Sequence, residues 1–258
     1  MKTEDRFSNR VDNYVKFRPH YPVAVYDHLL SEGVIPKGAV IADAGCGTGI
    51  SSKLFLKQGH KVFGIDPNKN MLDAAAEFLN DDNFIPVYSR AENTSLENKS
   101  VDLVICAQAF HWFDKQKAKQ EFQRILTPNG YVALMWNDRR TTSTDFLKVY
   151  EDFLQMFGTD YKEVNHKNVQ DKKIFESFFG NTSYNEKVIY NYQDLDFVGL
   201  KGRVLSSSYM PTEEHPDFNY MLYCLKKIFQ RYQENDKIRI EYDTILYYGR
   251  FDKFSTAR

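Results

Sequence analysis

A glycine-rich turn at residues 45–49 constrains the fold of this chain more than any other feature of its sequence. An apolar, β-prone run at residues 39–42 leads into Asp43 and then into three glycines at alternate positions. Residues 51–58 follow with the pattern of a helix. Glycines permit positive φ angles and let a ligand approach the backbone where a Cβ would clash. Because nucleotide-like ligands bind at the carboxyl ends of parallel strands, the turn predicts a strand–turn–helix unit that holds such a ligand.

Strand-like and helix-like segments alternate around this turn. The expected strands cover residues 39–42, 61–65, 84–88, 101–106 and 131–136, and the expected helices cover residues 51–58, 71–79 and 115–126. A turn at residues 127–130 is expected to end the last of these helices. Pro86 favours an edge position for its strand. Strands separated by helices of about 10–15 residues indicate βαβ units, so we predict an α/β fold with a parallel sheet.

The pattern changes after residue 137. Residues 144–180, 194–205 and 215–233 look helical, whereas residues 183–192 and 238–249 alternate like strands. We expect the two late strands to close the sheet at one edge. The helices between them are then expected to form a lid over the ends of the parallel strands.

Two carboxylates narrow the choice of ligand. In the dinucleotide fingerprint Gly-x-Gly-x-x-Gly, a pyrophosphate lies on the helix N-terminus. Here the spacing is Gly-x-Gly-x-Gly, and Asp43 before the first glycine would repel a pyrophosphate and attract an amino group. Asp66 ends the next strand, where a carboxylate can accept hydrogen bonds from both ribose hydroxyls. A nucleoside with an amino-acid tail suits both positions, and S-adenosylmethionine is such a molecule.

The motifs resemble those of class I S-adenosylmethionine-dependent methyltransferases. Successive family motifs are similar to residues 43–49, 64–67, 89–92, 101–106 and 126–130. The resemblance covers about residues 38–137 and implies a Rossmann-like, doubly wound sheet of seven strands. Its order would be 3-2-1-4-5-7-6, with the last strand in sequence antiparallel. A narrower likeness, at residues 14–22, 108–113 and 202–209, is to the trans-aconitate methyltransferase-like branch, which includes small-molecule carboxyl methyltransferases.

A single methyltransferase domain over residues 1–258 follows from this resemblance. Its parts would be an N-terminal cofactor-covering segment (1–37), a cofactor-binding core (38–137), a helical substrate lid with one sheet strand (138–236), and a closing strand and tail (237–258). The expected cofactor residues are Asp43, Gly45, Gly47, Gly49, Asp66, Ala91, Glu92, Gln108, Tyr14, Arg18 and Tyr21. The expected substrate contacts are Arg18, His111, Trp112, Arg203, Ser207 and Tyr209.

Several of these residues have a plain structural alternative. Asp66 could cap a helix, and Asp43 could stiffen the turn through backbone N–H groups. His111 could position or deprotonate an acceptor, or it could be a structural histidine. Arg203 could lie on a solvated lid helix. Cys46 is expected to be an apolar filler and not a nucleophile.

The expected function is methyl transfer from S-adenosylmethionine to a small molecule, with S-adenosylhomocysteine as the product. A carboxylate acceptor is favoured, because Arg18, His111 and Arg203 could meet an anion and a carboxylate nucleophile needs no base. The alternatives are a non-catalytic S-adenosylmethionine-binding regulator, or a methyltransferase acting on an amine, RNA or protein. The glycine spacing disfavours a nicotinamide oxidoreductase.

Composition limits the partners and the compartment. With 34 Lys and Arg against 35 Asp and Glu, the net charge is -1, which argues against a general nucleic-acid binder. The sequence has no apolar run near the roughly 20 residues of a membrane helix, and its N-terminus is polar. Three cysteines without a Cys-x-x-Cys pair give no disulfide framework or zinc site. We therefore expect a cytoplasmic protein without a metal, and the oligomeric state stays open.

Overall fold

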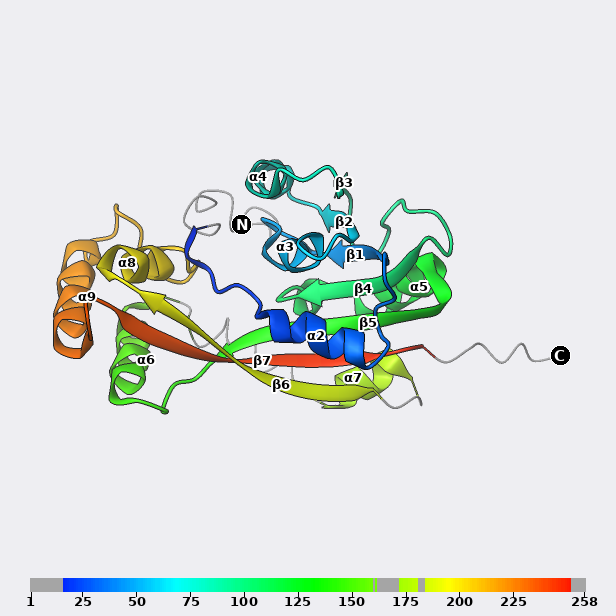
Figure 1. Ribbon diagram of the computed structural model, residues 1–258. Helices are drawn as coiled ribbons and strands as arrows, with labels where there is room; N and C mark the ends of the chain where they lie inside the picture. The colour runs from blue at the N-terminus through cyan, green and yellow to red at the C-terminus, as the bar shows by residue number, and fades with distance from the viewer. Residues whose placement is uncertain (1–15, 160, 162–171, 181–183, 252–258) are drawn as a thin grey trace. The chain divides into compact units, whose positions relative to one another are not determined.

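A seven-stranded sheet organises the part of the chain that the computed structural model describes, residues 16–159, 161, 172–180 and 184–251. The strands are β1 (Val40–Ala44), β2 (Lys61–Asp66), β3 (Phe84–Tyr88), β4 (Val101–Ala107), β5 (Leu126–Arg139), β6 (Asn185–Leu195) and β7 (Ile238–Gly249). Their order is β3-β2-β1-β4-β5-β7-β6, with β7 running against the direction of β4 and β6 (Figure 1). This confirms the predicted sheet, including the edge position of the strand that contains Pro86.

The helices agree with the sequence pattern, with two additions at residues 23–31 and 110–112. They are α2 (Val23–Ser31), α3 (Ile50–Leu56), α4 (Lys69–Leu79), α5 (Lys115–Ile125), α6 (Asp145–Phe157), α7 (Lys172–Phe179), α8 (Phe197–Leu205), α9 (Phe218–Tyr232) and the short 3₁₀ helix η3 (Phe110–Trp112). Side chains cap four of them, because Asn68, Asp114, Thr144 and Asp196 each accept a hydrogen bond from a first-turn N–H group. Helix α2 has no such cap and was not predicted.

Strand β5 is longer than the sequence pattern indicated. It begins at Leu126, directly after α5, and the prediction of a separate turn before Tyr131 is wrong. Leu126 pairs with Val101 and Tyr131 pairs with Leu103, so the intervening residues bulge opposite Asp102. The Asp102 carboxylate accepts a hydrogen bond at 3.3 Å from the threonine that follows Leu126, which holds the bulge against β4.

Contacts group the chain into two compact units. Unit 1 consists of Met1–Pro19, Asn137–Asn165 and Tyr190–Asp243, and unit 2 consists of His20–Trp136, His166–Ile189 and Thr244–Arg258. Strands β5, β6 and β7 each contribute residues to both units. The division of the chain into four functional parts stays a prediction.

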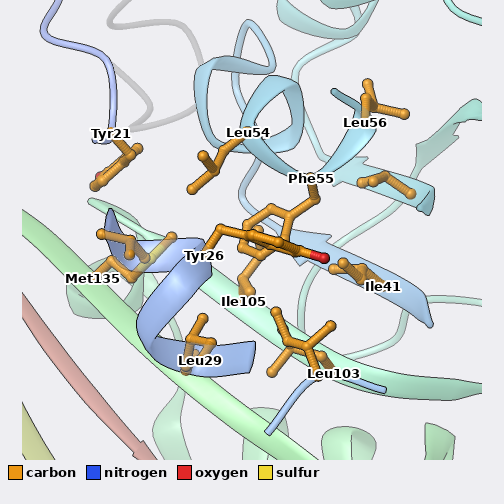
Figure 2. Packing of buried hydrophobic residues seen from close by; sticks show 14 of the residues in the cluster. Tyr21, Tyr26, Leu29, Ile41, Leu54, Phe55, Leu56, Leu103, Ile105 and Met135 are labelled. Carbon is orange, nitrogen blue, oxygen red and sulfur yellow. The ribbon is translucent and has the colours of Figure 1, made fainter. Parts of the chain in front are cut away.

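The core of unit 2 explains why α2 forms without a side-chain cap. Tyr26 and Leu29 of α2 are buried in one cluster with Phe55 of α3 and Ile41 of β1 (Figure 2). The rings of Tyr26 and Phe55 meet edge-on, 6.4 Å apart. Burying a large apolar side chain contributes about 1.5–3 kcal/mol, so packing can stabilise a helix that its ends do not. The same cluster fixes the position of β1, which ends at the glycine turn.

Unit 1 has its own hydrophobic core, built mainly from helices. The fully buried members Leu147 of α6, Leu200 of α8 and Met221 of α9 belong to one cluster. Ile240 and Tyr242 of β7 complete it. This core joins α6, α8 and α9 to β7.

Candidate functional site

The three glycines of the turn are required for different reasons. Each has a positive φ, +72° at Gly45, +54° at Gly47 and +79° at Gly49. A Cβ on Gly45 would lie 2.5 Å from Ala109 Cβ, and one on Gly49 would lie 2.6 Å from the Leu79 side chain. A Cβ on Gly47 would have no described atom within 4 Å. Packing explains the first and third glycines, whereas Gly47 has open space beside it for a ligand.

Asp43 is a fully buried carboxylate at the end of β1. Its Oδ2 accepts hydrogen bonds from the hydroxyls of Ser51, at 2.7 Å, and Ser52, at 2.6 Å. Its Oδ1 is also buried and has no hydrogen-bond partner in the described part of the chain. Burial raises the pKa of Asp43 to about 6, the two serine hydroxyls oppose this rise, and Asp66 adds to it. The oxygen without a partner would be satisfied by a donor on a ligand.

Asp66 joins the end of β2 to the glycine turn. Its Oδ2 accepts the backbone N–H of Gly47 at 2.9 Å, and its Oδ1 accepts that of Asn68 at 2.8 Å. The cap of α4 is the side chain of Asn68, so Asp66 does not have the capping role that sequence left open. Burial raises the pKa of Asp66, and the two N–H groups lower it. Since each carboxylate oxygen can accept two hydrogen bonds, Asp66 has capacity left for ribose hydroxyls.

The loops after β3 and β4 contain the next predicted residues. Ala91 is buried, and the Glu92 carboxylate accepts the backbone N–H of Asp114 at 2.8 Å, which ties its loop to the start of α5. Gln108 has a φ of +56°, a strained value for a residue other than glycine, and donates its N–H to Met135 O at 2.9 Å. These loops are held by specific hydrogen bonds.

The 3₁₀ helix η3 places His111 and Trp112 side by side. Their rings are 4.7 Å apart, and Trp112 is 44% exposed. The preceding Phe110 is fully buried and packs edge-on against Phe178 at 4.7 Å. The buried phenylalanine anchors the loop and leaves the tryptophan at the surface.

The other predicted residues divide between the two units. Tyr21 is buried in the core of unit 2, and Tyr14 lies outside the described residues. In unit 1, Arg18 donates to the carbonyl oxygen of Ser206 at 2.8 Å. Arg203 is only 9% exposed, which contradicts its interpretation as part of a solvated helix.

Ser207 and Tyr209 accompany Arg203 in unit 1. The Ser207 hydroxyl accepts a hydrogen bond from Arg203 Nη1 at 3.0 Å. The ring of Tyr209 meets that of Tyr161 edge-on at 5.0 Å. The structure therefore brings Arg203 and Ser207 into direct contact and surrounds them with aromatic residues.

Thr48 is a polar residue of the turn that sequence reasoning missed. It is 1% exposed, and its hydroxyl has no hydrogen-bond partner among the described residues. Its position between Gly47 and Gly49 could have marked it as a candidate site residue from the sequence. Cys46, also in the turn, is buried, and burial raises the pKa of its thiol, which fits a packing role.

The described residues indicate neither a metal site nor a membrane span. They contain no group of three or more His, Cys, Asp or Glu side chains arranged to hold a metal ion. Among them, no helix combines the length and apolar character needed to cross a membrane.

Comparison with known proteins places the glycine-turn region in a family. Residues 42–134 match the family model described as a methyltransferase domain. An uncharacterized methyltransferase-like protein of Schizosaccharomyces pombe is 35% identical over 140 residues, 53% of each chain. An uncharacterized methyltransferase of Mycobacterium tuberculosis is 36% identical over 134 residues, 52% of each chain. The chain thus spans about half the length of the curated relatives it matches.

Solved structures extend the likeness in fold to most of the chain. A provisionally assigned type II methyltransferase from Anaeromyxobacter dehalogenans superposes with a TM-score of 0.65 at 21% identity, covering 91% of this chain and 98% of the other. A provisionally assigned methyltransferase of an antibiotic biosynthesis pathway from Anabaena variabilis gives a TM-score of 0.61 at 22% identity, covering 90% and 98%. Residues 42–134 therefore match a methyltransferase domain in sequence, and most of the chain shares its fold with these solved structures.

Proposed function

We propose that this protein transfers the methyl group of S-adenosylmethionine to a small-molecule acceptor. The observation that carries the proposal is the buried Oδ1 of Asp43, which lacks a partner among the described residues at a turn where Gly47 leaves open space. The ammonium group of the cofactor would supply the missing donor and an opposite charge. A pyrophosphate would instead add negative charge beside Asp43 and Asp66.

The rest of the cofactor would follow the ends of β2, β3 and β4. Asp66 would accept the ribose hydroxyls while it continues to bind Gly47 N–H. Ala91 would meet the adenine edge with its backbone, and Glu92 would lie near the adenine amino group. The backbone of Gln108 would lie beside the methionine portion. Tyr14, Arg18 and Tyr21 are proposed to cover the bound cofactor.

Methyl transfer from a sulfonium requires little of the protein beyond the alignment of the acceptor with the methyl group. Bound S-adenosylmethionine supplies a methyl group on a sulfonium, which is already an activated leaving group. Holding the acceptor in line with that methyl group can lower the barrier by about 7–11 kcal/mol. A carboxylate acceptor arrives ionised, whereas an amine or hydroxyl acceptor would use His111 as its base. Trp112 would offer an aromatic face to the positive charge of the sulfonium.

A carboxylate-bearing acceptor, as in the trans-aconitate methyltransferase-like branch, is the proposed substrate. It is supported by Arg203, a buried guanidinium that forms no salt bridge with a described carboxylate. Arg18 is the second proposed anion partner, although its bond to Ser206 O also suits a structural clamp. An RNA acceptor is disfavoured by the balanced charge of the chain.

Calorimetric titration tests the cofactor assignment. S-adenosylhomocysteine should bind and NAD should not. Asp66→Ala should weaken S-adenosylhomocysteine binding by at least about tenfold, or 1.4 kcal/mol. Asp73→Ala is the matched control, because Asp73 is an exposed carboxylate of α4 that pairs with Lys69. Unchanged affinity in the Asp66 variant would refute the ribose role.

Turnover on panels of carboxylic acids, amines and RNA then tests the acceptor. Methylation of acids alone supports the proposal. Methylation of amines or RNA would refute the carboxylate acceptor and leave the methyltransferase assignment intact. Binding of S-adenosylhomocysteine without turnover on any panel would indicate the non-catalytic regulator.

A further inference from the structure

Two arginines of unit 1 interact with the same buried tyrosine. Arg139 ends β5, Arg203 belongs to α8, and Tyr150 of α6 is 2% exposed. The Arg139 guanidinium carbon is 5.2 Å from the centre of the Tyr150 ring, and Arg203 interacts electrostatically with the same tyrosine. Neither Arg139 nor Tyr150 was indicated by the sequence. We call these three residues, with Glu151, Tyr161 and Tyr242, the Tyr150 cluster.

The charge of Arg139 is balanced inside the cluster. Its Nη2 donates to the Glu151 carboxylate and, at 3.0 Å, to the Tyr161 hydroxyl, which in turn donates to Glu151 at 2.8 Å. Burial raises the pKa of Glu151, but hydrogen bonds from Gln155, Arg139 and Tyr161 hold it below its ordinary value. Arg139 and Glu151 therefore form an ionised, net neutral pair. One buried nitrogen, Arg139 Nη1, has no hydrogen-bond partner among the described residues.

The charge of Arg203 is not balanced in the same way. Its Nε donates to the Tyr242 hydroxyl at 3.4 Å and its Nη1 to the Ser207 hydroxyl at 3.0 Å, and both acceptors are neutral. Burial raises the pKa of the Tyr150 phenol, so this neighbour stays neutral as well. No described carboxylate forms a salt bridge with Arg203. Buried charges are normally paired, and this one has N–H groups left to donate.

Three other cations of unit 1 do not change this charge count. Arg140 pairs with Asp243 at 2.7 Å, and Arg239 pairs with Asp194 at 2.7 Å. Arg18 donates to Ser206 O at the C-terminal end of α8, where the helix dipole favours a cation. The Tyr150 cluster as a whole thus carries one positive charge in excess.

From this charge count we infer that the Tyr150 cluster binds the acceptor through two unlike contacts, and that Glu151 limits the acceptor to one negative charge at this site. Arg203 pairs with one carboxylate of the acceptor. Arg139 Nη1 donates to a neutral oxygen, such as a carbonyl, ester or hydroxyl, because Glu151 repels a second full negative charge there. The methyl-accepting group is a further part of the same molecule. This proposal rests on the proposed function, because that function identifies the bound anion as the methyl acceptor.

The test uses three series of small molecules that share a carbon chain and differ in charge. The probes are linear dicarboxylic acids of four to eight carbons, their monomethyl esters and their dimethyl esters, titrated at pH 7.5 into the full chain saturated with S-adenosylhomocysteine. The wild type should bind the best monoester at least threefold more tightly than the matching diacid or diester. Arg203→Gln should weaken monoester binding at least tenfold, and Arg203→Lys, which keeps the charge, should retain part of it.

Glu151→Gln is the sharper variant, because it leaves the charge of Arg139 unbalanced. It should reverse the preference, so that the diacid binds more tightly than the monoester. Arg239→Gln, at an exposed cation of the same unit, should change neither affinity nor preference. The S-adenosylhomocysteine affinity of each variant shows that it is folded.

Three results would overturn the inference. They are equal binding of monoester and diester, an unchanged preference in Glu151→Gln, and no binding by any probe in the series. If S-adenosylhomocysteine itself fails to bind, the proposed function fails. The acid titrations repeated without it would still decide whether the Tyr150 cluster is an anion site.

Discussion

The two compact units both bury a charge without an opposite charge beside it, but the sign differs. In unit 2 the charge is the Asp43 carboxylate, which is stabilised by two serine hydroxyls. In unit 1 it is the Arg203 guanidinium, which is stabilised by a tyrosine and a serine hydroxyl. Neither forms a salt bridge with another described residue. An unpaired buried ion costs several kcal/mol, which is the reason that we propose a ligand group of opposite charge in each unit.

The two units also differ in the elements that hold their polar groups. In unit 2 the polar groups lie on a strand–turn–helix backbone, and Asp66 fixes the turn through Gly47 N–H. In unit 1 they lie on side chains from separate elements, joined by phenol and serine hydroxyls. We propose that the first arrangement binds one invariant ligand, the cofactor. The second can change its charge preference through a single side chain such as Glu151.

The largest expected effect separates the structural and ligand roles of the glycine turn. Gly45→Ala should destabilise the protein by about 2–5 kcal/mol, because a Cβ there meets Ala109 and the residue must also keep a positive φ. Gly47→Ala should cost only about 1–2 kcal/mol, since its Cβ enters open space. Urea denaturation measures both.

For the same two variants, the loss of S-adenosylhomocysteine affinity should follow the opposite order to the loss of stability. Gly47→Ala should lose S-adenosylhomocysteine affinity by at least about tenfold, because its new methyl group would occupy the space proposed for the ligand. If Gly47→Ala binds as well as the wild type does, the ligand does not approach this face of the turn.

The second prediction concerns the buried carboxylate. The folded state raises the pKa of Asp43 from 3.8 to about 6. The stabilising contribution of its protonated form is thus complete below pH 3.8 and is lost as the pH rises through about 6. Asp43→Asn should therefore be more stable than the wild type at pH 7, by at most about 3 kcal/mol. The urea midpoints of the wild type and of Asp43→Asn, measured between pH 4 and pH 7.5, should converge at the acidic end.

The cofactor should respond to Asp43 in the opposite sense. Wild-type affinity for S-adenosylhomocysteine should fall as the pH drops through about 6, because the proton removes the charge that attracts the ammonium group. Asp43→Asn should bind at least about tenfold more weakly and lose this pH dependence. A variant that binds normally would show that Asp43 only stiffens the turn.

Sequence reasoning predicted the part of the fold that local patterns encode. The strands of the first half were found because each combines an apolar run with a turn residue, and Asp66 was found because it ends such a run. Order and direction of the last strands came from the family resemblance and not from local pattern. The β5 bulge was missed because Pro128 and Gly130 have the composition of a turn, whereas the hydrogen bond from Thr127 to Asp102 holds this segment beside β4.

The unit 1 residues could be predicted only in part. Arg203 was selected through a family likeness, but its burial depends on packing with Tyr242 of β7, far along the chain. Arg139, Tyr150 and Glu151 form no motif, and only the fold brings both Arg139 and Arg203 within electrostatic reach of Tyr150. Glu92 was correctly placed on a loop, but its bond to Asp114 N–H could not be read from spacing.

The smallest expected effect tests whether a second polar atom of the turn is reserved for the cofactor. Thr48 buries a hydroxyl without a partner among the described residues, which costs about 1 kcal/mol or more. Thr48→Val removes that hydroxyl at similar shape and should stabilise the ligand-free protein by roughly 1 kcal/mol. If the cofactor uses the hydroxyl, S-adenosylhomocysteine affinity should fall about threefold to tenfold. Thr48→Ser, which keeps the hydroxyl, should retain the affinity. A Thr48→Val variant that gains stability and binds normally would show that the cofactor does not use this hydroxyl, and would leave the buried Oδ1 of Asp43 as its proposed partner.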